Sequence, residues 1–226
     1  MQVALIAHTP EPESVICRAA HVCYSDKPVD QIDTSDAPRM ISKIIGAGHL
    51  SVLEHASFTF AIEGISRVCL AQLTRHRLAS YSVRSQRYVA VGENDWSAPR
   101  GTPIDEYSDR FNEYRNAVKN GIKKEDARYL LPQGVTTALV LTMNARELLH
   151  FFALRCCHKA QWEIRQLANA MLEIVKPVAP NVFKNAGASC RQNGFCQEAI
   201  PCGKVDIPHK HFLFELYRFW LEERNK

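Results

Sequence analysis

The sequence lacks several features that define common protein classes. Its first residues, MQVALIAHTPEPES, carry no Lys or Arg before a short apolar run, which argues against a secretory signal peptide. No apolar stretch approaches the roughly 20 residues that span a bilayer. Gly46 and Gly48 follow a predicted helix rather than a strand and have no third glycine, so a dinucleotide-binding fingerprint is absent. We therefore expect a soluble, cytoplasmic protein without a Rossmann fold that does not bind membranes.

The cysteine spacing that is typical of zinc ribbons is also missing. The chain has eight cysteines, and no two of them form a C-x-x-C pair. The last three, Cys190, Cys196 and Cys202, are spaced C-x5-C-x5-C. In an intracellular protein, cysteines are more often free thiols or ligands than disulfides. We expect the three late cysteines to have a structural role, and we expect no metal ion to be bound.

Acidic residues are absent from one long segment. Between Gly64 and Gly92 there is no Asp or Glu, although the whole chain has 24. The arginines inside this segment are Arg67, Arg75, Arg77, Arg84 and Arg87. Clustered guanidinium groups repel one another, so an anionic ligand is expected to compensate them. Phosphate suits the guanidinium fork. Arginines paired with distant acids, or a solvated basic patch, are the alternative interpretation.

The composition itself is that of an ordinary globular protein. The 226 residues are 46% hydrophobic with a net charge of +4, which suits one sizeable domain rather than a strongly basic nucleic-acid binder. Alternating and apolar runs predict strands over 2–8, 56–64, 83–91 and 136–142. Helical spacing predicts helices over 11–24, 37–49, 65–73, 107–120, 123–131, 144–175 and from 209 onward. We expect a kink near 156–157 in the longest of them and a loop over 92–103. This mixture predicts a single α+β domain over 1–226, with a mainly antiparallel sheet flanked by helices.

Three groups of polar residues stand near predicted helix ends. Ser51 and Glu54 have the spacing of a capping box, and Asn144 with Glu147 predicts another helix start. Arg155 lies in an otherwise apolar segment, LLHFFALRCC, so its guanidinium needs a partner. An internal ion pair is one interpretation of Arg155, and a bound ligand is the other.

Separated motifs of this chain resemble those of the flavin-dependent thymidylate synthases. Arg75-His76-Arg77, followed after seven residues by Ser85, matches the signature of that family, and the match continues through SQRY. Upstream, GHLSVLEHASFTF resembles the family's Gly-His and Glu-His-x-x-Phe-Thr-Phe segment. Downstream, ARYLLP, TMNAREL and LRCCHKAQWEIR follow in the family's order and spacing. The resemblance covers roughly residues 1 to 185 and leaves the cysteine-rich tail outside it.

The resemblance implies an activity and an assembly. It implies reductive methylation of dUMP to dTMP, with 5,10-methylenetetrahydrofolate as carbon donor, FAD as hydride carrier and NADPH as reductant. It implies a homotetramer with active sites where subunits meet. The other thymidylate synthase class adds a cysteine of a Pro-Cys-His motif to the uracil, and the nearest match here is Pro201-Cys202-Gly203. Activation is therefore expected to be electrostatic, with Arg155 stabilising charge on the pyrimidine.

The resemblance also assigns residues to each ligand. The residues implied to bind FAD are Ser51, Arg75, His76, Arg77, Asn144, Arg146 and His150. The residues implied to bind dUMP are Gln72, Ser85, Gln86, Arg87, Arg128 and Arg155. The residues implied to lie at the reacting groups are Arg155, Ser85 and His49, and no general base near Ser85 marks it as a nucleophile.

Some positions depart from the family pattern, and two other classes of function are possible. The family often has Glu or Gln at Val83 and Asn at His150, and Lys159 replaces a histidine of some members. A module that binds single-stranded nucleic acid would use the arginines, with Tyr81 and Tyr88 as stacking platforms. A cysteine- and histidine-based metal protein is the other alternative. Flavin absorbance of the purified protein separates the enzyme from both.

Overall fold

The computed structural model describes residues 1–92, 95–99, 101 and 108–224. The chain divides into two compact units, which are described one at a time below. The first comprises Met1–His8 and Phe58–Met143, and the second comprises Thr9–Ser57 and Asn144–Lys226. Part of the predicted loop over 92–103, and Tyr107 at the predicted start of a helix, lie outside the described residues. In the described part of the chain, no helix combines the length and the hydropathy needed to cross a membrane.

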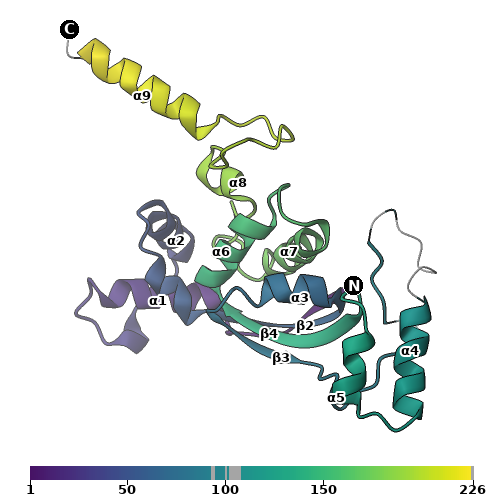
Figure 1. The fold of residues 1–226 in the computed structure, drawn as a ribbon. Helices are drawn as coiled ribbons and strands as arrows, with labels where there is room; N and C mark the ends of the chain where they lie inside the picture. The colour runs from purple at the N-terminus through teal and green to yellow at the C-terminus, as the bar shows by residue number, and fades with distance from the viewer. Residues whose placement is uncertain (93–94, 100, 102–107, 225–226) are drawn as a thin grey trace. The chain divides into compact units, whose positions relative to one another are not determined.

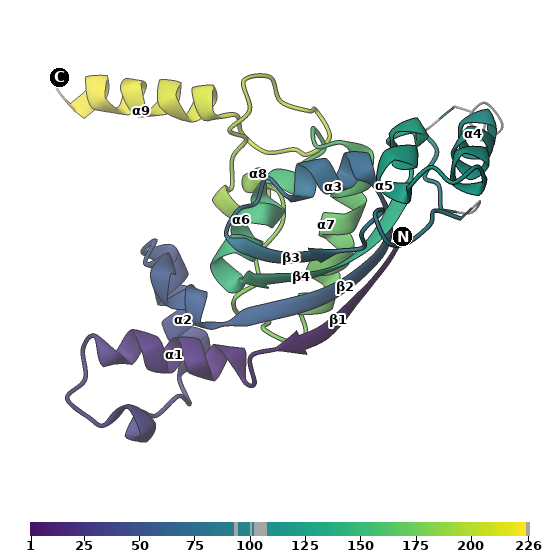
Figure 2. The same ribbon diagram turned by 60° about the horizontal axis from the view of Figure 1, so that its bottom comes forward.

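The first unit is built on a four-stranded sheet in the order β1-β2-β4-β3 (Figure 2). The strands are β1 (Gln2–His8), β2 (Ser57–Ser66), β3 (Ala79–Val83) and β4 (Thr136–Asn144). β1 pairs antiparallel with β2, and β3 pairs antiparallel with β4. In β2, Phe58, Phe60 and Ile62 are fully buried and alternate with half-buried neighbours, as expected for a strand with one covered face. The predicted α+β fold with a mainly antiparallel sheet is confirmed.

Helices of the first unit follow the strands. They are α3 (Arg67–Leu73), α4 (Ser108–Lys119), α5 (Lys124–Ala127) and the 3-10 turn η4 (Arg128–Leu130). The Ser66 hydroxyl caps α3 by accepting a hydrogen bond from the main-chain N–H of Cys69 at 3.0 Å, so this helix begins after Ile65, which belongs to β2. α4 and α5 lie side by side at one end of the sheet in both views (Figures 1 and 2), and Tyr114 and Ala127 form their core.

The prediction of a strand over 83–91 was wrong. β3 ends at Val83, and a turn follows it. The carbonyl of Ser85 accepts hydrogen bonds from the N–H groups of Tyr88 and Val89, and its hydroxyl accepts one from the N–H of Arg87 at 3.2 Å. A serine that satisfies nearby main-chain groups in this way favours a turn over a strand. Ser85 and Arg87 therefore do not share the face of an extended segment.

The second unit is mainly helical (Figure 1). Its elements are α1 (Pro12–Val22), η1 (Val29–Gln31), α2 (Ala37–Gly46), η2 (Leu50–His55), α6 (Ala145–Arg155), α7 (Trp162–Val175), α8 (Ser189–Asn193) and α9 (Lys210–Arg224). α1 packs against α2 and η2, and the fully buried side chains of Ile16, Ile41 and Leu53 lie on these elements. α6 packs against η2, α7 and α8.

The long helix predicted over 144–175 is two helices. α6 ends at Arg155 and α7 begins at Trp162. The side chain of Gln161 caps α7 by accepting hydrogen bonds from the N–H groups of Glu163 and Ile164. The predicted kink near residue 156 is therefore a complete break. Arg155 and Trp162 do not share one face of a continuous helix.

Glu13 ties α1 to the segment that follows α7. Its carboxylate accepts hydrogen bonds from the main-chain N–H and the side-chain amide of Asn181, both at 2.6 Å, and from the N–H of Val182 at 3.2 Å. Replacing Glu13 with alanine leaves these donors unpaired. We expect the variant to lose about 2 kcal/mol of unfolding free energy, measured by urea denaturation. In the control, Glu173→Ala removes only an exposed pair with Lys176 and is expected to cost about 0.5 kcal/mol or less. Equal losses in the two variants would contradict this account.

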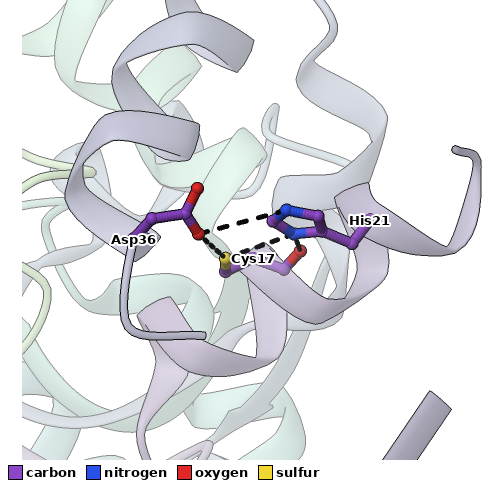
Figure 3. A group of neighbouring side chains, drawn as sticks. All are labelled: Cys17, His21 and Asp36. Carbon is purple, nitrogen blue, oxygen red and sulfur yellow. Dashed lines mark hydrogen bonds and ion pairs between the residues drawn. The ribbon is translucent and has the colours of Figure 1, made fainter. Parts of the chain in front are cut away.

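Cys17, His21 and Asp36 form a compact polar cluster between α1 and the start of α2 (Figure 3). The Cys17 thiol donates to the Asp36 carboxylate at 3.5 Å, and Nδ1 of His21 lies 3.0 Å from the main-chain oxygen of Cys17. Burial, and then the hydrogen bond to Asp36, raise the pKa of the Cys17 thiol to about 11. The thiol therefore stays protonated at neutral pH.

The raised pKa of Cys17 predicts a large difference in thiol reactivity. Cys17 is fully buried in α1, whereas Cys23, the residue directly after this helix, is exposed. At pH 8 we expect iodoacetamide to modify Cys23 at least about a hundredfold faster than Cys17, because only the thiolate reacts. Peptide mass mapping after timed quenching checks this expectation. Comparable rates in the folded protein would show that Cys17 is neither buried nor protonated.

Candidate functional site

The first unit gathers positive charge around the turn that follows β3. An open hollow of about 340 Å³ is lined by Arg87, Tyr88, Lys123, Lys124 and Glu125. Nε of Arg87 lies 2.6 Å from the carboxylate of Glu125, which holds the guanidinium at the rim. Nζ of Lys124 donates to the main-chain oxygen of Tyr88 at 2.9 Å. Three cations and one carboxylate thus face the same hollow, which favours an anionic ligand.

Two more arginines belong to this basic cluster. Nε of Arg128 donates to the main-chain oxygen of Glu125, so its charge is not neutralised by that carboxylate. Arg67 donates from its guanidinium to the main-chain oxygen of Arg84 at 3.1 Å, while its Nε is buried without a hydrogen-bond partner. Burial, and then the nearby positive charge of Arg128, lower the pKa of Arg67. Arg67 and Arg128 therefore repel each other, and a bound anion would relieve that repulsion.

The predicted Arg75-His76-Arg77 motif lies just beyond the end of α3. The hydroxyl of Tyr81, on β3, lies 2.8 Å from the main-chain oxygens of both Leu73 and His76 and so holds this turn against the strand. His76 is buried, whereas Arg75 and Arg77 are exposed. In the part of the chain that the structure describes, neither exposed arginine forms an ion pair. Both guanidinium groups are therefore open to an anionic ligand.

The other predicted residues of the first unit lie in α3 and in the turn after β3. Gln72, in α3, is half-buried and its side chain donates to the main-chain oxygen of Val68 at 3.3 Å. Ser85 and Gln86 are half-buried in the turn after β3, two residues and one residue before Arg87. The sequence assigned Gln72, Ser85 and Gln86 to the same ligand as Arg87 and Arg128. The structure describes all of them within the first unit.

The second unit brings η2 and the start of α6 together. The N–H of Ala145 donates to the main-chain oxygen of Ala56 at 2.8 Å, just after η2. Asn144 caps α6, its side-chain oxygen accepting from the N–H of Glu147 at 2.9 Å, which confirms the predicted helix start. Arg146 forms an ion pair with Glu54 of η2 at 2.5 Å. These contacts hold η2 against α6; η2 includes the exposed Ser51 and begins after the exposed His49.

The predicted capping box at Ser51 and Glu54 was wrong. η2 is a 3-10 helix whose N-cap is His49, and no side chain caps it. Glu54 instead points its carboxylate at Arg146, 92 residues later in the chain. Sequence spacing could not reveal this pairing, because the partner belongs to a distant element. The ion pair leaves both side chains about half exposed, at 49% and 47%, so both can still reach a ligand.

His150 and Arg155 occupy later turns of α6. His150 is exposed, and Arg155 is the half-buried last residue of the helix. The chain continues through Cys156 and Cys157 to a connection that is held by Arg165, whose guanidinium donates to the main-chain oxygen of His158 at 2.8 Å. Arg155 therefore stands at a helix terminus with a fixed backbone on its C-terminal side.

Sequence reasoning missed three members of the basic cluster. Arg67 was noted in the acid-free segment but was not assigned to a ligand, and Lys123 and Lys124 were not considered. The available signal was the KK pair four residues before Arg128 in KKEDAR. It was overlooked because its proximity to Arg87 depends on the turn after β3, which the sequence did not predict.

The chain is similar to known proteins over most of its length. The family model described as "Thymidylate synthase complementing protein" matches residues 4–181. The flavin-dependent thymidylate synthase of Geobacter sulfurreducens is 45% identical, over 91% of this chain and 95% of its own length. That of Clostridium tetani is 41% identical, over 94% of this chain and 97% of its own. Among solved structures, the flavin-dependent thymidylate synthase ThyX of Helicobacter pylori, complexed with FAD and dUMP, aligns with a TM-score of 0.70 and 25% identity over 83% of this chain and all of its own.

Proposed function

We propose that this chain, which belongs to the family of flavin-dependent thymidylate synthases, converts dUMP to dTMP by reductive methylation. Bound FAD supplies the hydride, 5,10-methylenetetrahydrofolate supplies the carbon, and NADPH supplies the reducing equivalents. The related Helicobacter pylori enzyme has been solved with FAD and dUMP, which supports the same two ligands here. We further propose a homotetramer with active sites at the subunit interfaces.

The observation that carries the proposal is the excess of positive charge around the turn after β3. Arg87 and two lysines line a hollow that has a single carboxylate, Glu125. Arg128 donates to the main-chain oxygen of Glu125, and Arg67 lies near Arg128. A nucleotide monophosphate carries nearly two negative charges and accepts the paired N–H groups of a guanidinium. We assign the dUMP phosphate to Arg87 and Arg128. Ser85 and Gln86 precede Arg87 in the same turn and are assigned to the nucleotide's remaining polar groups, together with Gln72.

The residues assigned to FAD suit its negatively charged diphosphate and its polar ring. In the first unit, Arg75 and Arg77 present guanidinium groups that are free of ion pairs with any described residue. In the second unit, Arg146 supplies a further cation at the start of α6. The remaining residues assigned to FAD are Ser51, His76, Asn144 and His150. The buried imidazole of His76 and the capping role of Asn144 give these two a fixed position.

Arg155 is assigned to the uracil ring. C5 of dUMP becomes nucleophilic when negative charge is stabilised on the pyrimidine, and a fixed guanidinium provides that stabilisation. Arg155 is the last residue of α6, and the connection that follows is held by Arg165. Both features limit the movement of the Arg155 backbone. Ser85 positions the ring rather than attacking it, since no general base among the described residues accepts a hydrogen bond from its hydroxyl. His49 is assigned to the region where flavin and folate meet.

Flavin binding is the first test of this proposal. The purified protein is expected to be yellow, or to become yellow on addition of FAD, with about one flavin per chain. Arg77→Ala is expected to weaken FAD binding by at least about tenfold, because a charged hydrogen bond contributes about 1.5–3 kcal/mol. Arg110→Ala, which removes an exposed guanidinium paired with Glu113 on α4, is the matched control and should bind FAD normally. A colourless protein that does not bind added FAD would refute the proposal.

A further inference from the structure

Four cysteines converge on one small cavity in the second unit. The cavity, of about 30 Å³, is lined by Cys157, Cys190, Cys196 and Cys202 together with His158 and Glu198. All four thiols are free and half-buried. Three of them belong to the tail, whereas Cys157 follows the end of α6, 33 residues before Cys190. A volume of this size accommodates a single water-sized particle or ion.

The tail around this cavity lacks a core of its own, and its helix α8 is tied to α6 by the side-chain amide of Gln192, which donates to the main-chain oxygen of Leu149 at 3.0 Å. From residue 188 to residue 216, no side chain that the structure describes is buried. The only regular structure before α9 is the five-residue helix α8 and an isolated bridge between Cys196 and His209. A segment without a hydrophobic core is usually ordered by a disulfide, a metal ion or a partner subunit.

The backbone approaches the sulfur atom of one of these cysteines. The main-chain N–H of Lys204 donates to Sγ of Cys202 at 3.4 Å, across Gly203, whose φ is +65°. Hydrogen bonds from main-chain N–H groups to sulfur stabilise thiolates and orient them as ligands. Glycine permits the left-handed conformation of Gly203 at low cost.

We propose that Cys157, Cys190, Cys196 and Cys202 bind one zinc ion as four thiolates and thereby anchor the tail to the end of α6. Four cysteine ligands and tetrahedral geometry are typical of structural zinc sites. Binding replaces the thiol protons with the metal, so those protons are released to solvent. The main chain of Cys196 accepts from the N–H of Lys210 at 2.9 Å and donates to the oxygen of Pro208 at 2.8 Å, so the ion also fixes the start of α9.

The sequence argued against a metal because it has no C-x-x-C pair. The structure supplies the fourth ligand from a different element, next to His158 after the end of α6. The cluster of Cys17, His21 and Asp36 is the competing site in this unit, and its ligand atoms all lie within 4.8 Å of one another (Figure 3). The sulfur atoms of the four cysteines are farther apart than this, so a bound ion would draw them together. Its polar atoms already satisfy one another, since the thiol donates to Asp36 and the imidazole lies against a main-chain oxygen. It also offers only three ligands, of which Asp36 is about half exposed, at 47%.

Metal analysis of matched variants tests the proposal. The full-length protein is purified without chelators under reducing conditions and measured by plasma mass spectrometry. We expect one zinc per chain, and we expect Cys157→Ser and Cys202→Ser to contain less than about a tenth of it. Cys156→Ser changes the adjacent cysteine, which does not line the cavity, and is expected to keep the full zinc content. Cys17→Ser, which alters the competing cluster, is also expected to keep it.

A second measurement uses the wild-type protein, so it stays informative if the cysteine variants fail to fold. Zinc is withdrawn from the wild-type protein with a strong chelator, and trypsin cleavage is followed at Arg191 and Lys204. We expect the chelated protein to be cleaved in the tail at least about tenfold faster, with protection restored by added zinc. Four results would each overturn the proposal. They are less than about 0.2 zinc per chain, iron in place of zinc, loss of zinc from Cys17→Ser alone, and a native mass that shows disulfides among the four cysteines. Because flavin content is measured separately, these results do not depend on the proposed enzymatic activity.

Discussion

Arg155→Ala is expected to lower the turnover number by about a hundredfold or more while leaving the FAD content close to that of the wild type. Removing one fixed donor to a developing anion costs about 10²–10³ in rate in other enzymes. Arg155 is assigned to the uracil and not to the flavin, so the loss should fall on the chemical step. Turnover at saturating dUMP, together with flavin absorbance of the same samples, measures both quantities.

Arg155→Lys separates charge from geometry. A lysine keeps the positive charge but has no planar fork, so we expect it to recover only part of the lost turnover. Arg110→Ala, on α4, removes an exposed guanidinium of similar size and should change turnover by less than about twofold. If Arg155→Ala turns over dUMP as fast as the wild type at saturation, the assigned role of Arg155 is wrong.

Arg87→Ala is expected to raise the KM for dUMP by about 10- to 100-fold with a small effect on the turnover number. A hydrogen bond to a charged group contributes about 1.5–3 kcal/mol, and Arg87 is assigned to the substrate phosphate rather than to the reacting ring. The effect should depend on that phosphate. With deoxyuridine as substrate, which has no phosphate, wild type and variant should have the same kcat/KM.

Arg84 provides the matched control for Arg87. It lies three residues earlier, is exposed, and makes its described hydrogen bonds through its main chain, donating to Ala138 and accepting from Arg67. Arg84→Ala should therefore keep the KM for dUMP within about twofold. Equal increases for the two variants would mean that the segment acts as a diffuse basic patch, which is the alternative that the sequence left open.

The sequence predicted the local structure well where one pattern determined it. The alternation of Phe58, Phe60 and Ile62 identified β2, and the spacing of Asn144 and Glu147 identified the start of α6. In both cases the residues that determine the element lie within a few positions of one another. The mixture of helical and strand patterns also predicted the α+β fold, but no pattern predicted the strand order β1-β2-β4-β3.

The errors arose where a distant residue or a side chain determines the structure. Ser85 turns the chain after β3 by binding its own neighbours, although the residues that follow it favour a strand. Glu54 pairs with Arg146 instead of capping a helix, and Gln161 starts a new helix within a continuous helical pattern. Likewise, Cys157 lines the same cavity as the three tail cysteines although it lies 33 residues before the first of them. These contacts depend on tertiary structure that no local spacing encodes.

Release of tritium from [5-³H]dUMP is the most direct test of the proposed reaction. The reaction removes the hydrogen at C5 before the new methyl group is complete, so its release reports on the chemical step. We predict that tritium is released, with equal formation of dTMP, only when FAD, NADPH and 5,10-methylenetetrahydrofolate are all present. Release and dTMP formation at an undiminished rate by flavin-free protein, or no dTMP from the fully supplied flavoprotein, would contradict the account.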